Sequence, residues 1–330
     1  MKAEIENLLT DEILNKAIEL FELEKDKTVK INSFESFIFE SIWKGTPCIL
    51  RITHSSHRNI KQIKGELDWI NYLAENGAPV CKPFPSANGN FVEKIEHKDS
   101  SYFLVAIFRK AEGSFLDKNR QLLTDSLIMN WGRLVGKLHK LTKDYTPAEG
   151  TSRPIWSDYI PNIKEYLADE PIALQKVDEI IKSIGSLPKD RDSYGLIHYD
   201  IHQANFLISD DEEITVFDFD DSEYSWFVAD FAVLLFTVLW AKLNGERNRE
   251  EFIIDFLNKF LKGYNEANEL SNWWLSKISD FLRMRHILLY AVIVREHKLN
   301  PTEWSKKHID EWKPMIENDI PYVKLFEMND

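Results

Sequence analysis

Three residues near the middle of the chain have the types and spacing of a site that handles a metal-bound phosphate. Asp200 and Asn205 lie in the stretch HYDIHQAN, residues 198–205, and Asp218 follows in VFDFDD, residues 216–221. Magnesium takes few ligands from a protein, prefers oxygen, and leaves its other positions to phosphate and water. An amide oxygen and a carboxylate for the cation, with a second carboxylate left over, are the groups that phosphoryl transfer from a magnesium nucleotide requires.

A short hairpin is predicted to bring these residues together. Residues 206–208 and 214–217 are mainly apolar and predict two strands, and the acidic run between them predicts a solvated turn. Folding the strands as a hairpin places Asn205 beside Asp218, with Asp200 a few residues away. An oxygen site for magnesium is therefore expected at the mouth of the hairpin.

Two other interpretations of this segment stay open. His198 and His202 flank Asp200, and alternate residues of an extended segment share a face, as in some transition-metal sites. That interpretation gives Asn205 no role, and no further histidine or cysteine lies nearby in the sequence. A purely structural polar turn is the second alternative.

These residues resemble the motif of the aminoglycoside phosphotransferase and choline kinase-like families, whose fold is that of protein kinases. The family pattern is His-x-Asp-x-x-x-x-Asn, then an Asp at the end of a following strand, then Asp-x-Ala opening a helix. The stretch FDFDDS, residues 217–222, resembles most a bacterial branch with stress-response kinases and homoserine kinase-like proteins. Tyr199 stands where the family usually has glycine, at a position without a chemical role. The matching residues are His198, Asp200, Asn205, Asp218 and Asp230.

The resemblance assigns a role to each of these residues. It implies that Asp200 is the catalytic base, that Asn205 and Asp218 hold Mg²⁺, and that His198 and Asp230 brace the loop.

Composition excludes several other classes of function. With 330 residues, of which 44% are hydrophobic, the chain can bury one large core or two moderate ones. A net charge of −13 argues against nucleic acid or an anionic membrane as a partner. Cys48 and Cys81 both lie in apolar runs and form no disulfide framework, which is typical of a reducing cytosol. The acidic N-terminus does not resemble a signal peptide, so we expect a cytoplasmic protein.

The pattern of apolar residues changes along the chain. Before residue 112 it predicts a small sheet with helices, in the ranges 10–23 (helix, N-cap Thr10), 37–43, 48–52, 60–75 (helix), 91–95 and 102–108. After residue 113 it predicts mainly helices, in the ranges 129–141, 163–167, 173–184, 231–243, 252–264 and 273–295.

This change predicts an α+β protein with two lobes and a cleft. With the resemblance, the fold is a bilobal, protein kinase-like one. Residues 1–112 are the small β-rich N-lobe that binds nucleotide. Residues 113–330 are the large, mostly helical C-lobe that carries the catalytic and acceptor-binding groups.

Two charged residues of the first lobe lie among apolar neighbours. Arg51 shares a strand face with Ile49, and Glu66 interrupts the apolar stripe of the helix 60–75. Charges in such positions are rare unless paired, so we expect Arg51 and Glu66 to pair. By resemblance, Arg51 contacts nucleotide phosphates and Glu66 holds it, although the usual residue is lysine. The alternative is that both side chains lie near a lobe surface.

Other nucleotide contacts are predicted less directly. The segment 32–36 lacks the glycines of a phosphate-binding loop, and Ser33 and Ser36 are the phosphate contacts expected there by resemblance. The nucleotide base is expected to contact backbone groups of an inter-lobe linker around Phe108 to Lys110. A packing role is expected for His139. A late helix carries three further candidates that either face the substrate or satisfy core carboxylates, namely Arg283, Arg285 and His286.

The sequence thus predicts a Mg²⁺-dependent phosphotransferase that uses ATP, with GTP as the alternative nucleotide. The expected acceptor is the hydroxyl of a small molecule such as an amino-sugar, an amino alcohol or a hydroxy amino acid. A protein serine/threonine kinase and a catalytically inactive nucleotide-binding module are the alternatives. Acceptor identity and oligomeric state are not decided at this level.

Overall fold

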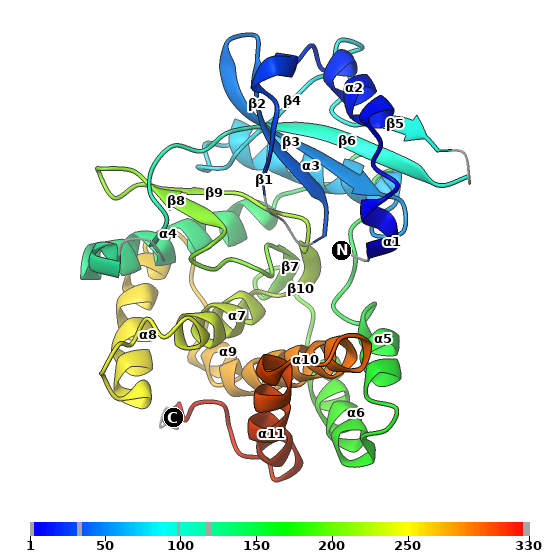
Figure 1. Cartoon of the computed structure of the whole chain (residues 1–330). Helices are drawn as coiled ribbons and strands as arrows, with labels where there is room; N and C mark the ends of the chain where they lie inside the picture. The colour runs from blue at the N-terminus through cyan, green and yellow to red at the C-terminus, as the bar shows by residue number, and fades with distance from the viewer. Residues whose placement is uncertain (1–2, 32–34, 98–99, 117–119, 326–330) are drawn as a thin grey trace. The chain divides into compact units, whose positions relative to one another are not determined.

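A computed structural model describes residues 3–31, 35–97, 100–116 and 120–325. The chain divides into two compact units (Figure 1). The first unit comprises Met1–Gly113, Asp144–Arg153 and Thr215–Asp220, and the second comprises Ser114–Lys143, Pro154–Ile214 and Asp221–Asp330.

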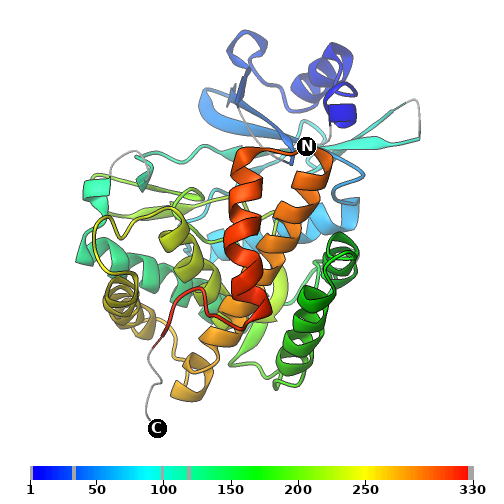
Figure 2. The same cartoon turned by 60° about the horizontal axis from the view of Figure 1, so that its bottom comes forward.

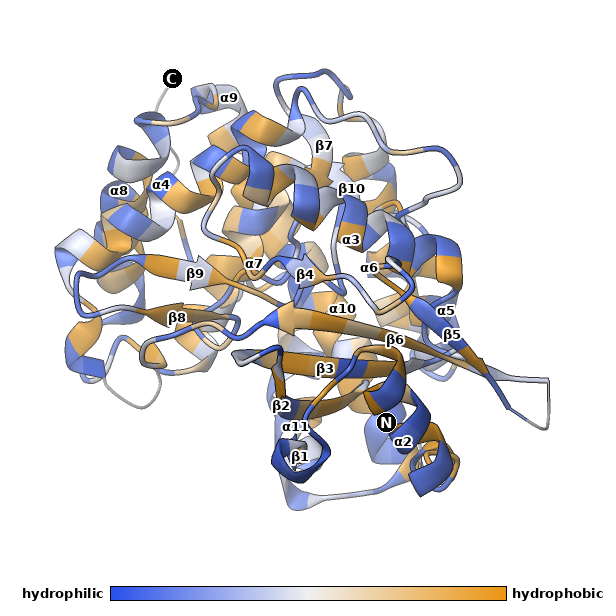
Figure 3. Cartoon of the chain, turned by 90° about the horizontal axis from the view of Figure 1, so that it is seen from above, coloured by the Kyte–Doolittle hydropathy of each residue, from blue (hydrophilic) through white to orange (hydrophobic). Residues whose placement is uncertain are grey.

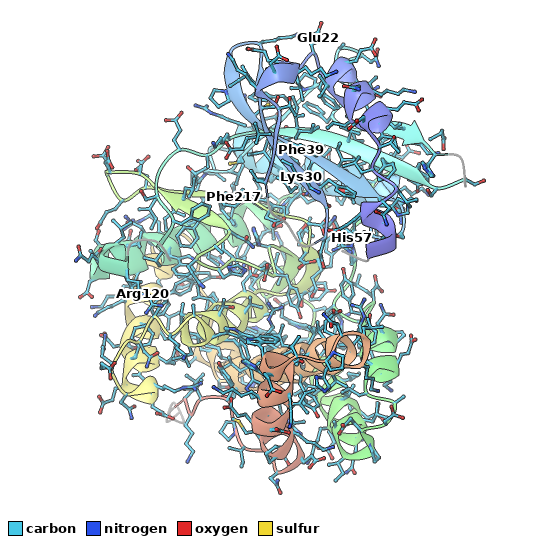
Figure 4. The ribbon with its side chains drawn as sticks, viewed as in Figure 1. Glu22, Lys30, Phe39, His57, Arg120 and Phe217 are labelled. Carbon is cyan, nitrogen blue, oxygen red and sulfur yellow. The ribbon has the colours of Figure 1, made fainter. Side chains whose placement is uncertain are left out.

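The first unit contains an antiparallel sheet in the order β1-β2-β3-β6-β4, with β5 paired to β6. Lys30 on β1 lies opposite Phe39 on β2, as Figure 4 shows. The turn between β2 and β3 uses Lys44 and Gly45, both with positive φ (47° and 80°), which is typical of a tight hairpin. The strands are β1 Val29–Ile31, β2 Phe37–Trp43, β3 Thr46–His54, β4 Pro83–Phe84, β5 Glu93–Glu96 and β6 Tyr102–Arg109.

Helices cover both faces of this sheet. The helix α2 (Asp11–Leu20) is capped by Thr10 as predicted, and it buries its apolar side against β2, β3 and β6. The helix α3 (Ile60–Glu75) ends at Asn76 and packs on the other face, against Leu104 and Ala106 of β6. Figure 3 shows the apolar character of β3 and β6 between these helices. The unit also contains α1 (Ala3–Glu6) and the short helix η1 (Lys25–Lys27).

The second unit is mainly helical. Its core helix α7 is buried along most of its length, and α10 and α11 lie side by side (Figure 2). The helices α4 and α8 approach closely at Gly132, where the absence of a side chain makes room for the Phe260 carbonyl; a Cβ there would collide with it. The helices are η3 Arg120–Leu122, α4 Asp125–Thr142, α5 Ile160–Tyr166, α6 Pro171–Gly185, α7 Phe227–Trp240, α8 Arg249–Asn265, α9 Asn272–Leu275, α10 Ile278–Leu299 and α11 Glu303–Glu317.

Short strands accompany these helices. The antiparallel strands β7 (Tyr194–Ile197) and β10 (Glu223–Trp226) flank the segments 198–205 and 216–221 in the sequence, with β7 before them and β10 after them. The strand β8 (Phe206–Ile208) lies where the sequence predicted it. The strand β9 (Ile214–Val216) is one residue shorter than predicted, and the boundary between the units falls within it.

The structure corrects several predicted elements. The single helix predicted over 273–295 is interrupted after Leu275, where the Ser276 hydroxyl bonds back to the Trp273 carbonyl at 2.7 Å and competes with the helical pattern. The strand β10 and the helix α11 were not predicted. Phe108 belongs to β6 rather than to a linker, since it pairs with Ile49 of β3.

The α+β division into a strand-rich first part and a helical second part is confirmed. Among the described residues, no helix has both the length and the apolar character needed to cross a membrane.

Candidate active site

The second unit holds Asp200 in a loop between β7 and β8, where donors reach both of its carboxylate oxygens. Oδ1 accepts a hydrogen bond from Nη2 of Arg285 at 3.1 Å. Oδ2 accepts one from Nδ2 of Asn205 at 3.0 Å, and Nε2 of His202 lies 3.2 Å from the same oxygen. The Asp200 side chain keeps 23% of its surface exposed, so a further group can still reach it.

These neighbours keep Asp200 ionised. Burial alone would raise the pKa of its carboxyl, but the hydrogen bond and charge of His202 and the charges of Arg285 and His198 lower the pKa below its ordinary value. An ionised carboxylate with a partly open face can accept a proton from a hydroxyl.

The loop around Asp200 is held as the family resemblance implied. Nδ1 of His198 accepts a hydrogen bond from the Asp200 backbone N–H at 3.3 Å. Oδ1 of Asp230, at the start of α7, accepts one from the Tyr199 backbone N–H at 2.7 Å. The prediction that His198 and Asp230 brace the loop is confirmed.

His139 connects this brace to the core of the unit. It is fully buried, stacks on Phe227 at 4.5 Å between ring centroids, and places Nε2 3.0 Å from Oδ2 of Asp230. Its Nδ1 lies 3.0 Å from the hydroxyl of Tyr264. The predicted packing role is confirmed, and His139 also orients Asp230.

Tyr199 adopts a left-handed backbone conformation, with φ at 63°. Such a conformation costs a residue with a Cβ about 1–2 kcal/mol, which explains why glycine is usual here. The position was expected to have no chemical role. That stays an expectation. The guanidinium of Arg285 lies over the Tyr199 ring, with Cζ 5.9 Å from its centroid.

Asn205 is oriented by its own amide nitrogen. Nδ2 donates to the backbone oxygen of Asp200 at 2.9 Å and to its carboxylate. This fixes which way the amide points and leaves Oδ1, an oxygen of the kind that binds cations, on the other side.

The interpretation of this segment as a transition-metal cluster receives little support from the geometry. Nδ1 of His198 is already bonded to the backbone of Asp200, and Nε2 of His202 faces the Asp200 carboxylate. Both histidines thus hydrogen-bond within the loop.

In the first unit, Arg51 and Glu66 form a buried, bidentate ion pair. Nη1 and Nη2 of Arg51 donate to the two carboxylate oxygens of Glu66 at 2.7 and 2.6 Å. The Phe108 ring covers the guanidinium at 4.9 Å. The predicted pairing is confirmed, and the alternative of two surface charges is wrong, since the side chains are 7% and 0% exposed.

The charges around Arg51 keep it protonated. Burial would lower the pKa of the guanidinium, but Glu66, with smaller contributions from Asp220 and Asp218, raises it above its ordinary value. A permanent cation is thus fixed beside the segment that carries Asp218.

Of the remaining predicted nucleotide contacts, Ser36 and Lys110 have hydrogen-bond or ion-pair partners within the first unit. The hydroxyls of Ser36 and Thr53 lie 2.9 Å apart and are buried, while Ser33 lies outside the described residues. Lys110 pairs with Glu40 at 2.8 Å, and its backbone N–H bonds to the Pro47 carbonyl.

A second charged cluster of the first unit was not predicted. The buried carboxylate of Asp220 accepts from Nε of Arg58 at 3.2 Å and lies 2.7 Å from Nε2 of His57, which is labelled in Figure 4. Arg153 bonds to the backbone oxygens of Phe219 and Asp220. The residues of this cluster lie far apart in the sequence, so their contacts could not be predicted from spacing. The sequence signal that could have pointed to them is the basic pair His57 and Arg58, which follows β3.

Asp218 precedes this cluster and has a positive φ of 63°. It follows β9 and belongs to the first unit, whereas Asn205 belongs to the second. The convergence of Asn205 and Asp218 stays a prediction.

The three candidates on α10 have different surroundings. Arg283 pairs with Glu179 and Asp319 at 3.2 and 2.6 Å, so it serves surface carboxylates. His286 is buried beside the Trp312 ring, and burial lowers its pKa to about 4. Arg285 alone of the three pairs with Asp200.

Glu223, at the start of β10, is a buried carboxyl that sequence reasoning missed. It is 1% exposed, and neither carboxylate oxygen has a partner with good hydrogen-bond geometry among the described residues. Burial, with Asp221, Asp230 and Asp158 nearby, raises its pKa well above the ordinary value, while the Ser225 hydroxyl acts in the opposite direction. Glu223 is therefore neutral over a wider pH range than an exposed glutamate.

Replacing Glu223 with glutamine is expected to flatten the pH dependence of stability. A raised folded-state pKa means that the folded protein binds the proton more tightly, so stability falls as pH rises above the unfolded value of about 4.5. Glu223→Gln stays neutral and should exceed the wild type by about 1–3 kcal/mol in unfolding free energy at pH 8, with little difference at pH 4. Denaturant unfolding at both values measures this. Glu269→Gln, at an exposed site, is the control, and equal pH slopes in all three proteins would contradict the assignment.

Comparison with known proteins supplies the family. A family model described as the phosphotransferase enzyme family matches residues 31–270. Amicoumacin kinase of Bacillus subtilis (strain 168) is 34% identical over 315 residues, covering 94% of this chain and 93% of the relative.

Solved structures agree with this match. An amicoumacin kinase in complex with AMP-PNP, Ca²⁺ and Ami superposes with a TM-score of 0.93 at 31% identity, covering 98% of each chain. A microcompartment-associated aminopropanol kinase gives 0.75 at 20% identity, covering 93% of this chain and 95% of the other. A spectinomycin phosphotransferase gives 0.62 at 14%, covering 93% and 98%, and shares the fold.

The predicted kinase-like fold is confirmed by these neighbours. A match over most of the chain, together with a braced aspartate in the family's loop, leads to one conclusion: the chain belongs to the phosphotransferase enzyme family and is a phosphotransferase.

Proposed function

We propose that this protein transfers the γ-phosphoryl group of ATP to a hydroxyl of a small, amine-bearing molecule, with Asp200 as the base. The observation that carries the proposal is the set of contacts to Asp200. Its carboxylate is ionised, held at both oxygens, and still partly exposed. Catalysis of this kind depends on positioning and electrostatics more than on covalent chemistry.

The acceptor hydroxyl would bind at the remaining open position of the Asp200 carboxylate. A carboxylate accepts about four hydrogen bonds, and Arg285, Asn205 and His202 already approach this one. A hydroxyl bound at the open position can pass its proton to Asp200 as its oxygen attacks phosphorus.

Asn205 and Asp218 would hold Mg²⁺. The donor set fits, because the Asn205 amide presents Oδ1 and Asp218 supplies a carboxylate. The Asp218 segment also carries Asp220, whose Oδ1 is buried without a hydrogen-bond partner among the described residues. When bound, the cation would neutralise phosphate charge.

The first lobe, residues 1–112, would bind the nucleotide, and the second, residues 113–330, the acceptor. Arg51, held by Glu66, would neutralise phosphate, which a guanidinium can do with two parallel hydrogen bonds. Ser36 would lie near the phosphates, and Phe108 and Lys110 near the nucleotide base. AMP-PNP and Ca²⁺ in the related amicoumacin kinase structure support a nucleotide and a divalent cation, with ATP preferred here and GTP as the alternative.

The relatives support an acceptor class. Proteins that match most of the chain include kinases named for amicoumacin and aminopropanol, and a spectinomycin phosphotransferase shares the fold. We therefore propose an amino-sugar, amino alcohol or hydroxy amino acid, with amicoumacin and aminopropanol as the first compounds to test.

Two measurements test this function. Thermal unfolding with ATP or GTP, with Mg²⁺ or EDTA, should show stabilisation by the magnesium nucleotide, because a ligand that binds only the folded state stabilises it. ADP release with a panel of hydroxylated amines should then identify an acceptor. Nucleotide binding without transfer to any compound would favour the inactive module, and transfer to a protein serine would favour a protein kinase.

Replacing Asp218 with alanine should remove the effect of magnesium on nucleotide binding. In the wild type, ATP is expected to raise the melting temperature more with Mg²⁺ than with EDTA. In Asp218→Ala this difference should vanish, because the carboxylate that carries the cation is missing. Asp211→Ala, in the exposed turn after β8, is the matched control. A full magnesium effect in Asp218→Ala would show that the cation is held elsewhere.

A further inference from the structure

A left-handed tyrosine and an arginine distant in sequence meet at Asp200 within the second unit. Tyr199 keeps its φ of 63° although it carries a Cβ, and strained residues of this kind concentrate at functional sites. Its ring lies beneath the Arg285 guanidinium, and Nη2 of that guanidinium reaches Oδ1 of Asp200 at 3.1 Å.

Arg285 is poorly placed to contribute stability. Its side chain is 14% exposed, and its buried Nε has no hydrogen-bond partner among the described residues. Burying a cation and leaving one of its donors without a partner costs free energy. This cost offsets much of what the ion pair contributes to stability. Its position is better explained by its effect on Asp200 than by stabilisation of the fold.

That effect is a restraint on the plane of the carboxylate. Arg285 holds Oδ1 from α10, whereas Asn205 and His202 hold Oδ2 from the loop itself. Rotation about the bond to the carboxylate would weaken contacts at both oxygens together. The open acceptor position of Asp200 is thereby aimed in one direction.

We propose that Arg285, seated on the Tyr199 ring, is a positioning residue that aims the Asp200 carboxylate at the acceptor hydroxyl. The inference rests on the proposed role of Asp200 as the base. A displacement of a catalytic group by about 1 Å can lower the rate on the order of a hundredfold. Loss of Arg285 should therefore lower kcat and leave the KM for ATP unchanged.

The test is a double-mutant cycle between Arg285 and Asp200. Arg285→Gln should lower kcat by about ten- to a hundredfold in the wild-type background. It should lower kcat by less than about threefold in an Asp200→Asn background, because the group that it aims is already lost. Arg285→Lys should recover part of the rate. The control is Arg283→Gln, two positions earlier on α10, which pairs with Glu179 and Asp319 and should leave kcat unchanged.

Substitutions of Tyr199 are a second test of the proposal. Tyr199→Phe keeps the ring under Arg285 and should therefore lower kcat less than Tyr199→Asn does. Tyr199→Asn tolerates the left-handed conformation but removes the ring, so it should lower kcat in the same direction as Arg285→Gln. Rates are measured as ADP release with amicoumacin and, without acceptor, with water. Denaturant unfolding of the same variants measures the Arg285–Asp200 coupling without any ligand.

The outcomes separate this inference from the proposed function. An inactive wild type with every acceptor and with water would overturn both. An active wild type in which Arg285→Gln is equally harmful in the wild-type and Asp200→Asn backgrounds would overturn the positioning role alone, as would unfolding data without coupling between the two residues. Coupling in both measurements, with rescue by lysine, supports it.

Discussion

Replacing Asp200 with asparagine is expected to slow phosphoryl transfer by about two to four orders of magnitude while leaving folding and nucleotide binding intact. The asparagine side chain is nearly isosteric and its oxygen can still accept from Arg285, but it cannot take a proton from a hydroxyl. Its amide nitrogen would replace the oxygen that accepts from Nδ2 of Asn205 and faces Nε2 of His202, so those contacts are lost, while Nδ2 of Asn205 keeps its hydrogen bond to the backbone oxygen of residue 200. Single-turnover ADP release measures the rate, and slow hydrolysis by water serves if no acceptor is found.

A matched control separates this effect from a change of charge. Asp210→Asn removes the same charge from the exposed turn after β8 and should transfer phosphate at the wild-type rate. Calorimetric ATP titration should give similar affinities for all three proteins. A wild-type rate in Asp200→Asn would place the base elsewhere.

The Arg51–Glu66 pair is expected to show the second large effect, on binding and on stability. Arg51→Met should lose much of the affinity for ATP, whereas Arg51→Lys should keep a measurable part of it, because a cation still reaches the phosphates. Glu66→Gln should weaken binding less than Arg51→Met, since Glu66 only orients the cation. Each of the two neutralising changes leaves one charge buried without its partner and should cost about 3–5 kcal/mol of unfolding free energy.

A double variant separates the two effects. Arg51→Met combined with Glu66→Leu leaves neither charge unpaired, so its stability should exceed that of Arg51→Met alone. Its ATP affinity should stay as low as that of Arg51→Met. Denaturant unfolding and calorimetry measure the two quantities. Wild-type affinity in all these variants would show that the pair does not touch nucleotide.

Local patterns in the sequence were enough for much of the first unit, such as the bounds of α3 and the turn at Lys44 and Gly45. The brace of Asp200 by His198 was implied by the family resemblance, and it too joins residues close in sequence. The Arg51–Glu66 pair was predictable although it joins two elements, because each charge interrupts an apolar pattern and each needs a partner of opposite sign.

Tertiary structure alone decided the contacts between distant residues. Arg285 lies 85 residues from Asp200, and His57 lies 163 residues from Asp220. No local pattern distinguishes Arg285, which pairs with Asp200, from Arg283, which pairs with surface carboxylates. The direction in which each points depends on how α10 packs in the second unit.

Backbone conformation and burial were also beyond the sequence. Tyr199 looked like a neutral replacement for glycine, yet its left-handed conformation places its ring under Arg285. Glu223 was not singled out from the sequence, yet β10 carries it into the interior. Periodicity and spacing report which residues can share a face. The free energy of packing decides which neighbours that face meets, and hence which charges are paired, aimed or neutralised.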